Sequence, residues 1–143
     1  MPPDEHRPGC IELQFRPKTY DIDFAGHVSN IVYIRWLEDL RLSFLDKHLP
    51  LSGLMEHGVA PVVMRTTIEY KKAVKLFDAV EGKMWIKDVG NVKGTLAAEF
   101  AVNHIVVAKA DQEGLFVKLD TGRPVAFPDE FKIVFEAAGG NHK

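Results

Sequence analysis

Polar side chains suited to acid–base chemistry stand directly before the most apolar stretch of the chain. The segment YDIDFAGHVSNIVYIRWLEDLR, residues 20–41, places Asp21, Asp23, His27 and Asn30 in its first half. A carboxylate or imidazole held in a loop can act as a nucleophile or as a general base. The first amides of a helix lack intrahelical partners and carry the positive end of its dipole, so they can polarise a carbonyl oxygen. The segment is therefore a candidate site, but these residues alone do not define the reaction.

A long helix is expected to follow these polar residues. Ser29 or Asn30 can cap it, and the pattern continues to about Lys47, before HLPLSG ends it. Apolar residues occupy most of its circumference, more than the single stripe of a surface helix. These residues are Tyr33, Trp36, Leu37, Leu40 and Phe44, with Ile31, Val32, Ile34, Leu42 and Leu45 beside them. Other elements must therefore cover the helix.

Strand patterns supply that cover. Apolar and polar residues alternate over residues 11–16, and residues 59–74, 79–90, 94–104 and 105–120 are rich in β-branched and aromatic residues. Residues 88–94 and 111–114 are typical of turns, and one helical turn is expected at 129–132. The order of one strand, a buried helix and a run of strands predicts an α+β fold, with an antiparallel sheet around one long central helix. Such a sheet leaves edges, which favours a dimer formed through an edge strand.

Composition excludes several classes of function. The chain has 143 residues and a net charge of −2, which indicates one domain without a general attraction for nucleic acid. Cys10 is the only cysteine, and no apolar run reaches the roughly 18 residues of a membrane span. Residues 1–10 are expected to form a flexible leader without the apolar core of a signal peptide, and residues 137–143 a flexible tail. We therefore expect a cytoplasmic protein with one domain at 11–136.

Other catalytic chemistries lack their signatures. The six histidines show no zinc-ligand spacing, and the chain contains neither a G-x-S-x-G elbow nor a P-loop. We therefore expect no metal and no separate cofactor.

The opening segment resembles the signature of hotdog-fold acyl-CoA thioesterases of the 4-hydroxybenzoyl-CoA thioesterase type. That signature is roughly D-x-D-x-x-G-H-V-N-N-x-x-Y-x-x-[WF]-E-x-x-R. The chain matches it in register at Asp21, Asp23, Gly26, His27, Val28, Asn30, Tyr33 and Arg41, and has Ser29 where the family more often has Asn. IEYKKAVKLFD resembles the family's strand ending in Tyr before a basic loop, and TGRPVAFPDEF resembles its usual ending. The resemblance covers about residues 11–132.

The resemblance implies a hotdog thioesterase that cleaves acyl-CoA, or acyl carrier protein thioesters, as a homodimer or homotetramer with sites at the subunit interface. Coenzyme A would be part of the substrate. The family role of its aspartate, nucleophile or general base on water, falls on Asp23, and the amide near Asn30 would polarise the carbonyl. Substrate contacts are expected from Gly26, His27, Tyr33, Trp36, Lys71 and Lys72.

Alternatives remain at this stage. Asp21 and Asp23 could be turn or capping residues, since Asp is favoured there. Glu38 is a rival catalytic acid, because some hotdog thioesterases place theirs on the central helix. A hydratase or dehydratase could pair His27 with Asp23 to move a proton at the α carbon. A non-catalytic acyl-CoA-binding module would keep the fold and the pocket. The identity of the acyl chain does not follow from these residues.

Overall fold

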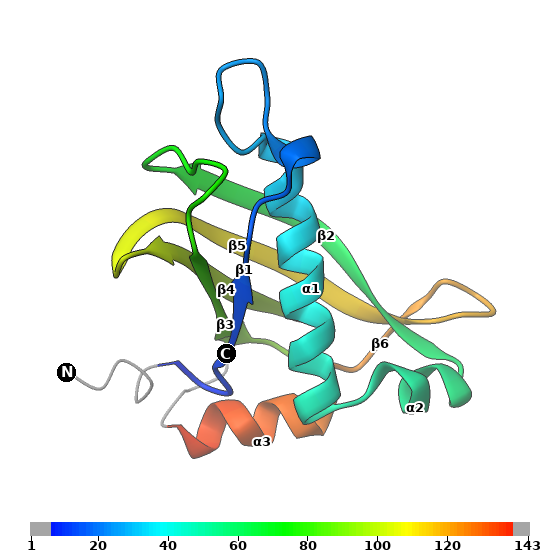
Figure 1. The fold of residues 1–143 in the computed structure, drawn as a ribbon. Coiled ribbons are helices and arrows are strands. Elements are labelled where there is room, and N and C mark those ends of the chain that lie inside the picture. Colours follow the sequence, from blue (N-terminus) through cyan, green and yellow to red (C-terminus); the bar gives the residue numbers. More distant parts are fainter. Residues whose placement is uncertain (1–6, 139–143) are drawn as a thin grey trace.

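An antiparallel sheet wraps around one central helix (Figure 1), in a computed structural model that describes residues 7–138. The expected α+β class is confirmed. In chain order the elements are β1 (Ile11–Phe15), a 3-10 turn (Thr19–Asp21), α1 (Asn30–His48), α2 (Leu51–Glu56), β2 (Val59–Tyr70), β3 (Val80–Val89), β4 (Lys93–Val102), β5 (Ile105–Lys118), β6 (Pro124–Val125) and α3 (Asp129–Ala137). The strand order is β1-β3-β4-β5-β2, with β6 paired to β5.

The core lies between α1 and the concave face of the sheet. Leu37, Leu40 and Phe44 on α1 are fully buried, as is Phe100 on β4. The three α1 residues recur at three- and four-residue spacing, so one face of the helix meets the sheet. Because β2 and β1 stand at the two ends of the strand order, each has one edge without a strand partner among residues 7–138.

The opposite face of α1 carries apolar residues as well, which is why the apolar sector of this helix is so broad. Ile31, Ile34 and Leu42 are exposed on this single chain, at 59%, 45% and 40% of their surface. The central helix is therefore covered on one side by its own sheet and presents apolar side chains on another.

One turn prediction is wrong. Residues 111–114 lie inside the continuous strand β5, although their composition is typical of a turn. A Cβ built on Gly114 would lie 2.6 Å from the carbonyl oxygen of Val62, so glycine here allows the backbone of β2 to approach closely.

The ends of the chain differ from expectation in length. The helical turn expected at residues 129–132 is the start of α3, whose Phe131 and Phe135 are buried one turn apart. The short helix α2 was not expected. Of the expected leader, residues 1–6 lie outside the described residues, whereas Arg7 forms an ion pair with Glu99 at 2.9 Å. Of the expected tail, residues 139–143 lie outside them too. No helix within residues 7–138 is long and apolar enough to cross a membrane.

Candidate active site

A short hairpin positions Asp23 beside the start of α1. Ile22 and Val28 form an antiparallel bridge, and the amide of Asp23 donates to the carbonyl of His27 at 2.8 Å. Gly26 has a φ of +80°, the left-handed conformation that glycine adopts without strain, and its amide donates to the carbonyl of Asp23 at 3.0 Å. Gly26 therefore closes the tight turn of this hairpin.

The carboxylate of Asp23 is held by one of its two oxygens. Its Oδ1 accepts hydrogen bonds from the amides of Ala25 at 2.9 Å and His27 at 3.2 Å. Its Oδ2 has no hydrogen-bond partner within residues 7–138, and the side chain is exposed. The turn therefore fixes the direction of the carboxylate and leaves one oxygen available to a ligand.

Asp21 has a structural role instead. It is 7% exposed, and its Oδ2 accepts a hydrogen bond from the amide of Lys18 at 2.8 Å. Its carbonyl accepts from the amide of Ser29 at 2.8 Å, which ties the base of the hairpin to the residue before α1. Of the two neighbouring aspartates, Asp21 is engaged within the fold and Asp23 faces outward.

The first amides of α1 are available to a ligand. Ser29 stands at the N-cap, and its side chain forms no capping hydrogen bond; its carbonyl accepts from the amide of Val32 at 3.0 Å. The amides of Asn30 and Ile31 have no acceptor in the part of the chain that the structure describes. Such unpaired amides lie at the positive end of the helix dipole and are suited to an oxygen with partial negative charge.

These groups face one surface depression with a volume of about 260 Å³. Its lining brings together Asp23, His27, Asn30, Tyr33, Lys71 and Lys72, all of them candidate residues from the sequence, with Val28, Tyr70, Ala73 and Val74. Val28 and Val74 join the two loops, because the amide of Val28 donates to the carbonyl of Val74 at 2.8 Å. Residues about 45 positions apart in the sequence therefore form one rim.

Two candidate residues lie elsewhere. Gly26 shapes the hairpin but does not line the depression. Trp36 is 6% exposed and stacks on Phe15 at a ring-centroid distance of 5.1 Å, with the edge of Tyr33 at 5.3 Å. The structure thus places Trp36 in the core rather than at the depression, because α1 turns this position toward β1.

Two tyrosines form the wall between α1 and the end of β2. The ring of Tyr33 meets that of Tyr70 edge-on at 5.2 Å. Burial, with a smaller contribution from Tyr70, raises the pKa of Tyr33 to about 12. Its hydroxyl is therefore protonated at neutral pH and can donate a hydrogen bond. Tyr70 was not among the candidate residues. Its position at the end of the strand, directly before the two lysines, is the sequence feature that could have indicated it.

The lysine pair forms a cationic rim with a fixed backbone. The amides of Lys71 and Lys72 both donate to the carbonyl of Val107, at 2.8 and 3.1 Å. The Lys71 ammonium lies 2.9 Å from Glu69, and this hydrogen bond and charge lower the pKa of Glu69. Lys72 has no ion-pair partner within residues 7–138.

The rival acid Glu38 does not face the depression. It is exposed on α1 and absent from the lining. Eight residues separate it from Asn30, or about 12 Å along a helix. No group of three or more histidines, cysteines or carboxylates within residues 7–138 could hold a metal ion.

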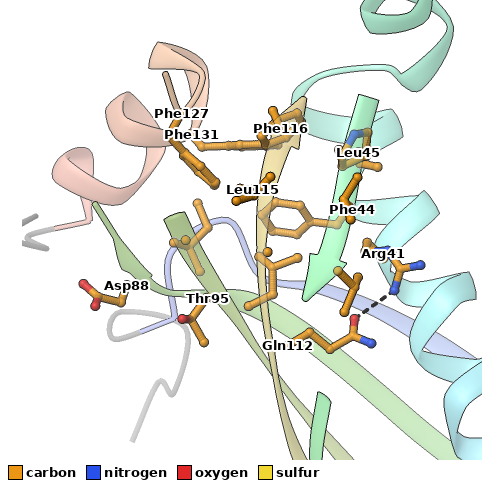
Figure 2. Close-up of a pocket in the computed structure, with 17 residues that line it drawn as sticks. Arg41, Phe44, Leu45, Asp88, Thr95, Gln112, Leu115, Phe116, Phe127 and Phe131 are labelled. Atoms are coloured by element: carbon orange, nitrogen blue, oxygen red, sulfur yellow. Dashed lines mark hydrogen bonds between the residues drawn. The ribbon is translucent and has the colours of Figure 1, made fainter. Parts of the chain in front are cut away.

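A second cavity lies at the other end of α1 (Figure 2). Its volume is about 60 Å³, and its lining comes from α1, β2, β3, β4, β5, α3 and the segment before α3. One side is polar: Arg41 Nη1 donates to Gln112 Oε1 at 2.9 Å, and Gln112 Nε2 donates to Thr66 Oγ1 at 3.2 Å. Burial lowers the pKa of Arg41, against a smaller opposing effect of Glu38. Asp88 and Thr95 add two further polar side chains, and the remaining lining is largely apolar and rich in phenylalanine.

The chain is similar to known thioesterases in sequence and in fold. The model of the thioesterase-like superfamily matches residues 17–135. The acyl-CoA thioesterase YbgC of Haemophilus influenzae is 28% identical over 117 residues, which cover 80% of this chain and 86% of that protein. The long-chain acyl-CoA thioesterase FadM of Escherichia coli is 23% identical over 128 residues, which cover 88% and 97%. The solved structure of a DHNA-CoA thioesterase from Staphylococcus aureus has a TM-score of 0.80 at 19% identity, over 91% of this chain and 89% of that one. The structural likeness agrees with the hotdog fold expected from the sequence.

Proposed function

This chain belongs to the thioesterase-like superfamily, and from that premise we propose that it hydrolyses the thioester bond of acyl-CoA, with Asp23 as its catalytic carboxylate. The observation that carries the proposal is the shared depression at the start of α1, which holds a carboxylate with one free oxygen beside unpaired helix amides. Hydrolysis of a thioester needs these two groups: one to supply or become the nucleophile, and one to stabilise the charge that develops on the carbonyl oxygen.

The thioester carbonyl would lie with its oxygen toward the amide of Asn30. Oδ2 of Asp23 would either take a proton from the attacking water or attack the carbonyl carbon itself, in which case water then cleaves the resulting acyl-aspartate anhydride. In both routes the carbon–sulfur bond breaks, the sulfur leaves as the thiolate of coenzyme A, and the fatty acid is released. The hydrogen bonds to Oδ1 support either role, since they fix the carboxylate without using Oδ2.

The nucleotide end of coenzyme A would lie across the lysine rim. The protein has a net charge of −2, so attraction for a polyanion has to be local. Lys71 and Lys72 line the same depression as Asp23 and are exposed. A phosphate bound there would meet the ammonium groups while the thioester reaches the start of α1.

The hydratase alternative has less support. It needs an imidazole held by an acid, but the bond between His27 and the Asp23 carboxylate runs through the backbone amide of His27. The binding-module alternative keeps the same geometry and differs only in turnover.

A hydrolysis assay of the purified protein tests the proposal. Acyl-CoA substrates from acetyl to stearoyl, with one aromatic acyl group, would be incubated and the free thiol measured. We expect release of coenzyme A and of the fatty acid in equal amounts. Binding of acyl-CoA without thiol release would favour the binding module, and hydration of an enoyl-CoA without thiol release would favour the hydratase. Acyl carrier protein thioesters would be run in parallel, as the alternative carrier.

The lysine rim makes the Michaelis constant depend on salt. Lys71→Ala combined with Lys72→Ala should raise the KM for acyl-CoA roughly three- to tenfold at low ionic strength, the scale of two exposed charge interactions. The KM of the unchanged protein should rise with salt, and that of the double variant should rise less, because exposed charges are screened. Steady-state kinetics across a salt series measures both.

Two matched variants sharpen this test. Lys93→Ala removes an exposed lysine outside the depression and should leave the KM unchanged. Glu69→Gln removes the ion-pair partner of Lys71 and should lower the KM at low salt. An identical salt response of the double variant and the unchanged protein would place the nucleotide elsewhere.

A further inference from the structure

The hydroxyl of Tyr33 is a polar group without a partner at an otherwise buried position. The residue is 2% exposed, and its side chain forms no hydrogen bond within residues 7–138. In that part of the chain, no buried or half-buried side chain has a fully enclosed nitrogen or oxygen atom that lacks a hydrogen-bond partner. The Tyr33 oxygen must therefore belong to the small part of the residue that reaches the surface. Because Tyr33 lines the depression beside Asp23, its hydroxyl opens into that depression.

Three aromatic rings fix the position of Tyr33. Its ring meets those of Trp36, Phe100 and Tyr70 edge-on, at centroid distances of 5.3, 5.4 and 5.2 Å. Trp36 and Phe100 belong to the core, so the ring is anchored on its inner side. A side chain packed in this way stays in one rotamer. The place of the hydroxyl is therefore set before a ligand arrives.

The helix directs this hydroxyl toward its own first turn. Tyr33 is three residues beyond Asn30 on α1, or about 4.5 Å along the axis at the helical rise per residue. Residues at this spacing share one face, and side chains on a helix lean toward its N-terminus. The ring of Tyr33 therefore extends back over the turn that begins at Asn30, whose amide has no acceptor in the described part of the chain. Asn30 and Tyr33 line the same depression.

The acidity of Tyr33 suits a hydrogen-bond donor rather than a general acid. Burial, with a smaller contribution from Tyr70, raises the pKa of Tyr33 to about 12. A free thiol has a pKa of roughly 8.5, so a departing thiolate is too weak a base to take the phenolic proton. The hydroxyl can instead strengthen its hydrogen bond to an oxygen that gains negative charge, and it keeps its proton throughout.

We propose that the hydroxyl of Tyr33 is a second donor to the thioester carbonyl oxygen, beside the backbone amide of Asn30. The inference rests on the proposed function, because it takes the thioester to lie at the start of α1. As the nucleophile adds to the carbonyl carbon, the carbonyl oxygen gains negative charge and both hydrogen bonds strengthen. When the carbon–sulfur bond breaks, the carbonyl forms again and the proton of Tyr33 has not moved. Donors held in fixed positions around the developing charge are what such a step requires.

Tyr33→Phe removes this donor and keeps the ring. Because the hydroxyl has no partner in the described part of the chain, its loss should leave the midpoint of thermal denaturation close to that of the unchanged protein. We expect kcat for acyl-CoA hydrolysis to fall roughly 10- to 30-fold, the scale of one hydrogen bond to a charged group, and KM to change little. A loss in kcat below about threefold would overturn the inference.

Tyr70→Phe is the matched control. It deletes the same group from an exposed ring in the same depression, at the end of β2 rather than on α1. Its kcat should stay within about threefold of the unchanged protein, because this hydroxyl is not assigned to the carbonyl oxygen. A larger loss of kcat in Tyr70→Phe than in Tyr33→Phe would assign the second donor to the wrong tyrosine and overturn the inference.

A dithioester substrate tests which atom accepts the hydrogen bond. Replacing the carbonyl oxygen by sulfur leaves a weak acceptor at that position. The loss of kcat in Tyr33→Phe should therefore shrink to less than about threefold on the dithioester of the same acyl group. A general distortion of the site would lower the turnover of both substrates equally, and that result would overturn the assignment to the carbonyl oxygen.

A bound ketone reports on the same contact without turnover. In an acyl-CoA analogue whose thioester sulfur is replaced by a methylene group, the carbonyl remains and cannot be hydrolysed. Infrared difference spectra of its isotope-labelled carbonyl should shift to lower wavenumber on binding, less so in Tyr33→Phe and equally in Tyr70→Phe. A protein that hydrolyses nothing and still shows this difference would refute the proposed function and support the inference. Equal carbonyl frequencies in Tyr33→Phe and the unchanged protein would overturn it.

Discussion

Asp23→Asn is expected to lower kcat for acyl-CoA hydrolysis by at least ~10²-fold, the usual scale for losing a positioned acid–base group. Asparagine keeps the size of the side chain, and its amide oxygen can still accept the bonds from Ala25 and His27 that hold the turn. It lacks the charge and the basicity that Oδ2 would supply. KM should change little, because the proposed contacts to coenzyme A do not involve the Asp23 carboxylate. Steady-state kinetics on the acyl-CoA that the hydrolysis assay identifies as a substrate measures both constants.

Two other carboxylates serve as controls. Glu38→Gln changes an exposed acid outside the depression and should leave kcat close to that of the unchanged protein. Asp21→Asn weakens a buried bond to the amide of Lys18, so it should lower thermal stability more than it lowers kcat. Circular dichroism establishes that each variant is folded. Normal turnover in Asp23→Asn with an inactive Glu38→Gln would move the catalytic acid onto α1.

Hydrophobic periodicity was sufficient to predict the main elements. The helix expected from Ser29 or Asn30 to about Lys47 is α1, Asn30–His48, because a capping residue, a long apolar segment and the break at HLPLSG together mark its length. The strands were equally readable from β-branched and alternating residues. Residues 111–114 were wrongly predicted to form a turn, because their composition alone is typical of turns. Gly114 lies in β5 because the backbone of β2 approaches closely there, which the local sequence does not reveal.

Part of the candidate site could be predicted from the sequence, because several of its residues lie in one short segment. Asp23, His27, Asn30 and Tyr33 are near neighbours in sequence, so one motif carries them, and the structure places them at one depression with the lysine pair. Trp36 was grouped with them because a helix that is apolar nearly all round does not reveal which side faces a ligand. The catalytic role of Asp23, the assembly of subunits and the substrate contacts stay predictions.

The second cavity had no local signal at all. Its lining combines residues of α1, of four strands and of the last part of the described chain, which are far apart in the sequence. Only the folded arrangement shows that these residues line one cavity.

Asn30→Pro is expected to reduce kcat by about 10²- to 10³-fold, the usual effect of removing one donor to a developing oxyanion. Proline at the first helical position removes a backbone N–H that has no acceptor within residues 7–138, and its fixed φ suits a helix start. Ser29, with φ −66° and ψ 146°, already has the extended conformation that a residue before proline requires. The substitution therefore deletes the amide and preserves α1.

Asn30→Ala separates the backbone from the side chain. Alanine keeps the amide and removes the carboxamide, so its kcat should stay within about threefold of the unchanged protein if the backbone N–H is the group that polarises the carbonyl. Thermal denaturation should show similar midpoints for both variants, because the first helical position tolerates either residue. Equal losses of kcat in Asn30→Ala and Asn30→Pro would assign the function to the side chain. Full activity in Asn30→Pro would show that the amide of Asn30 takes no part in catalysis. The amide of Ile31 could not simply replace it, because it lies one residue further from Asp23.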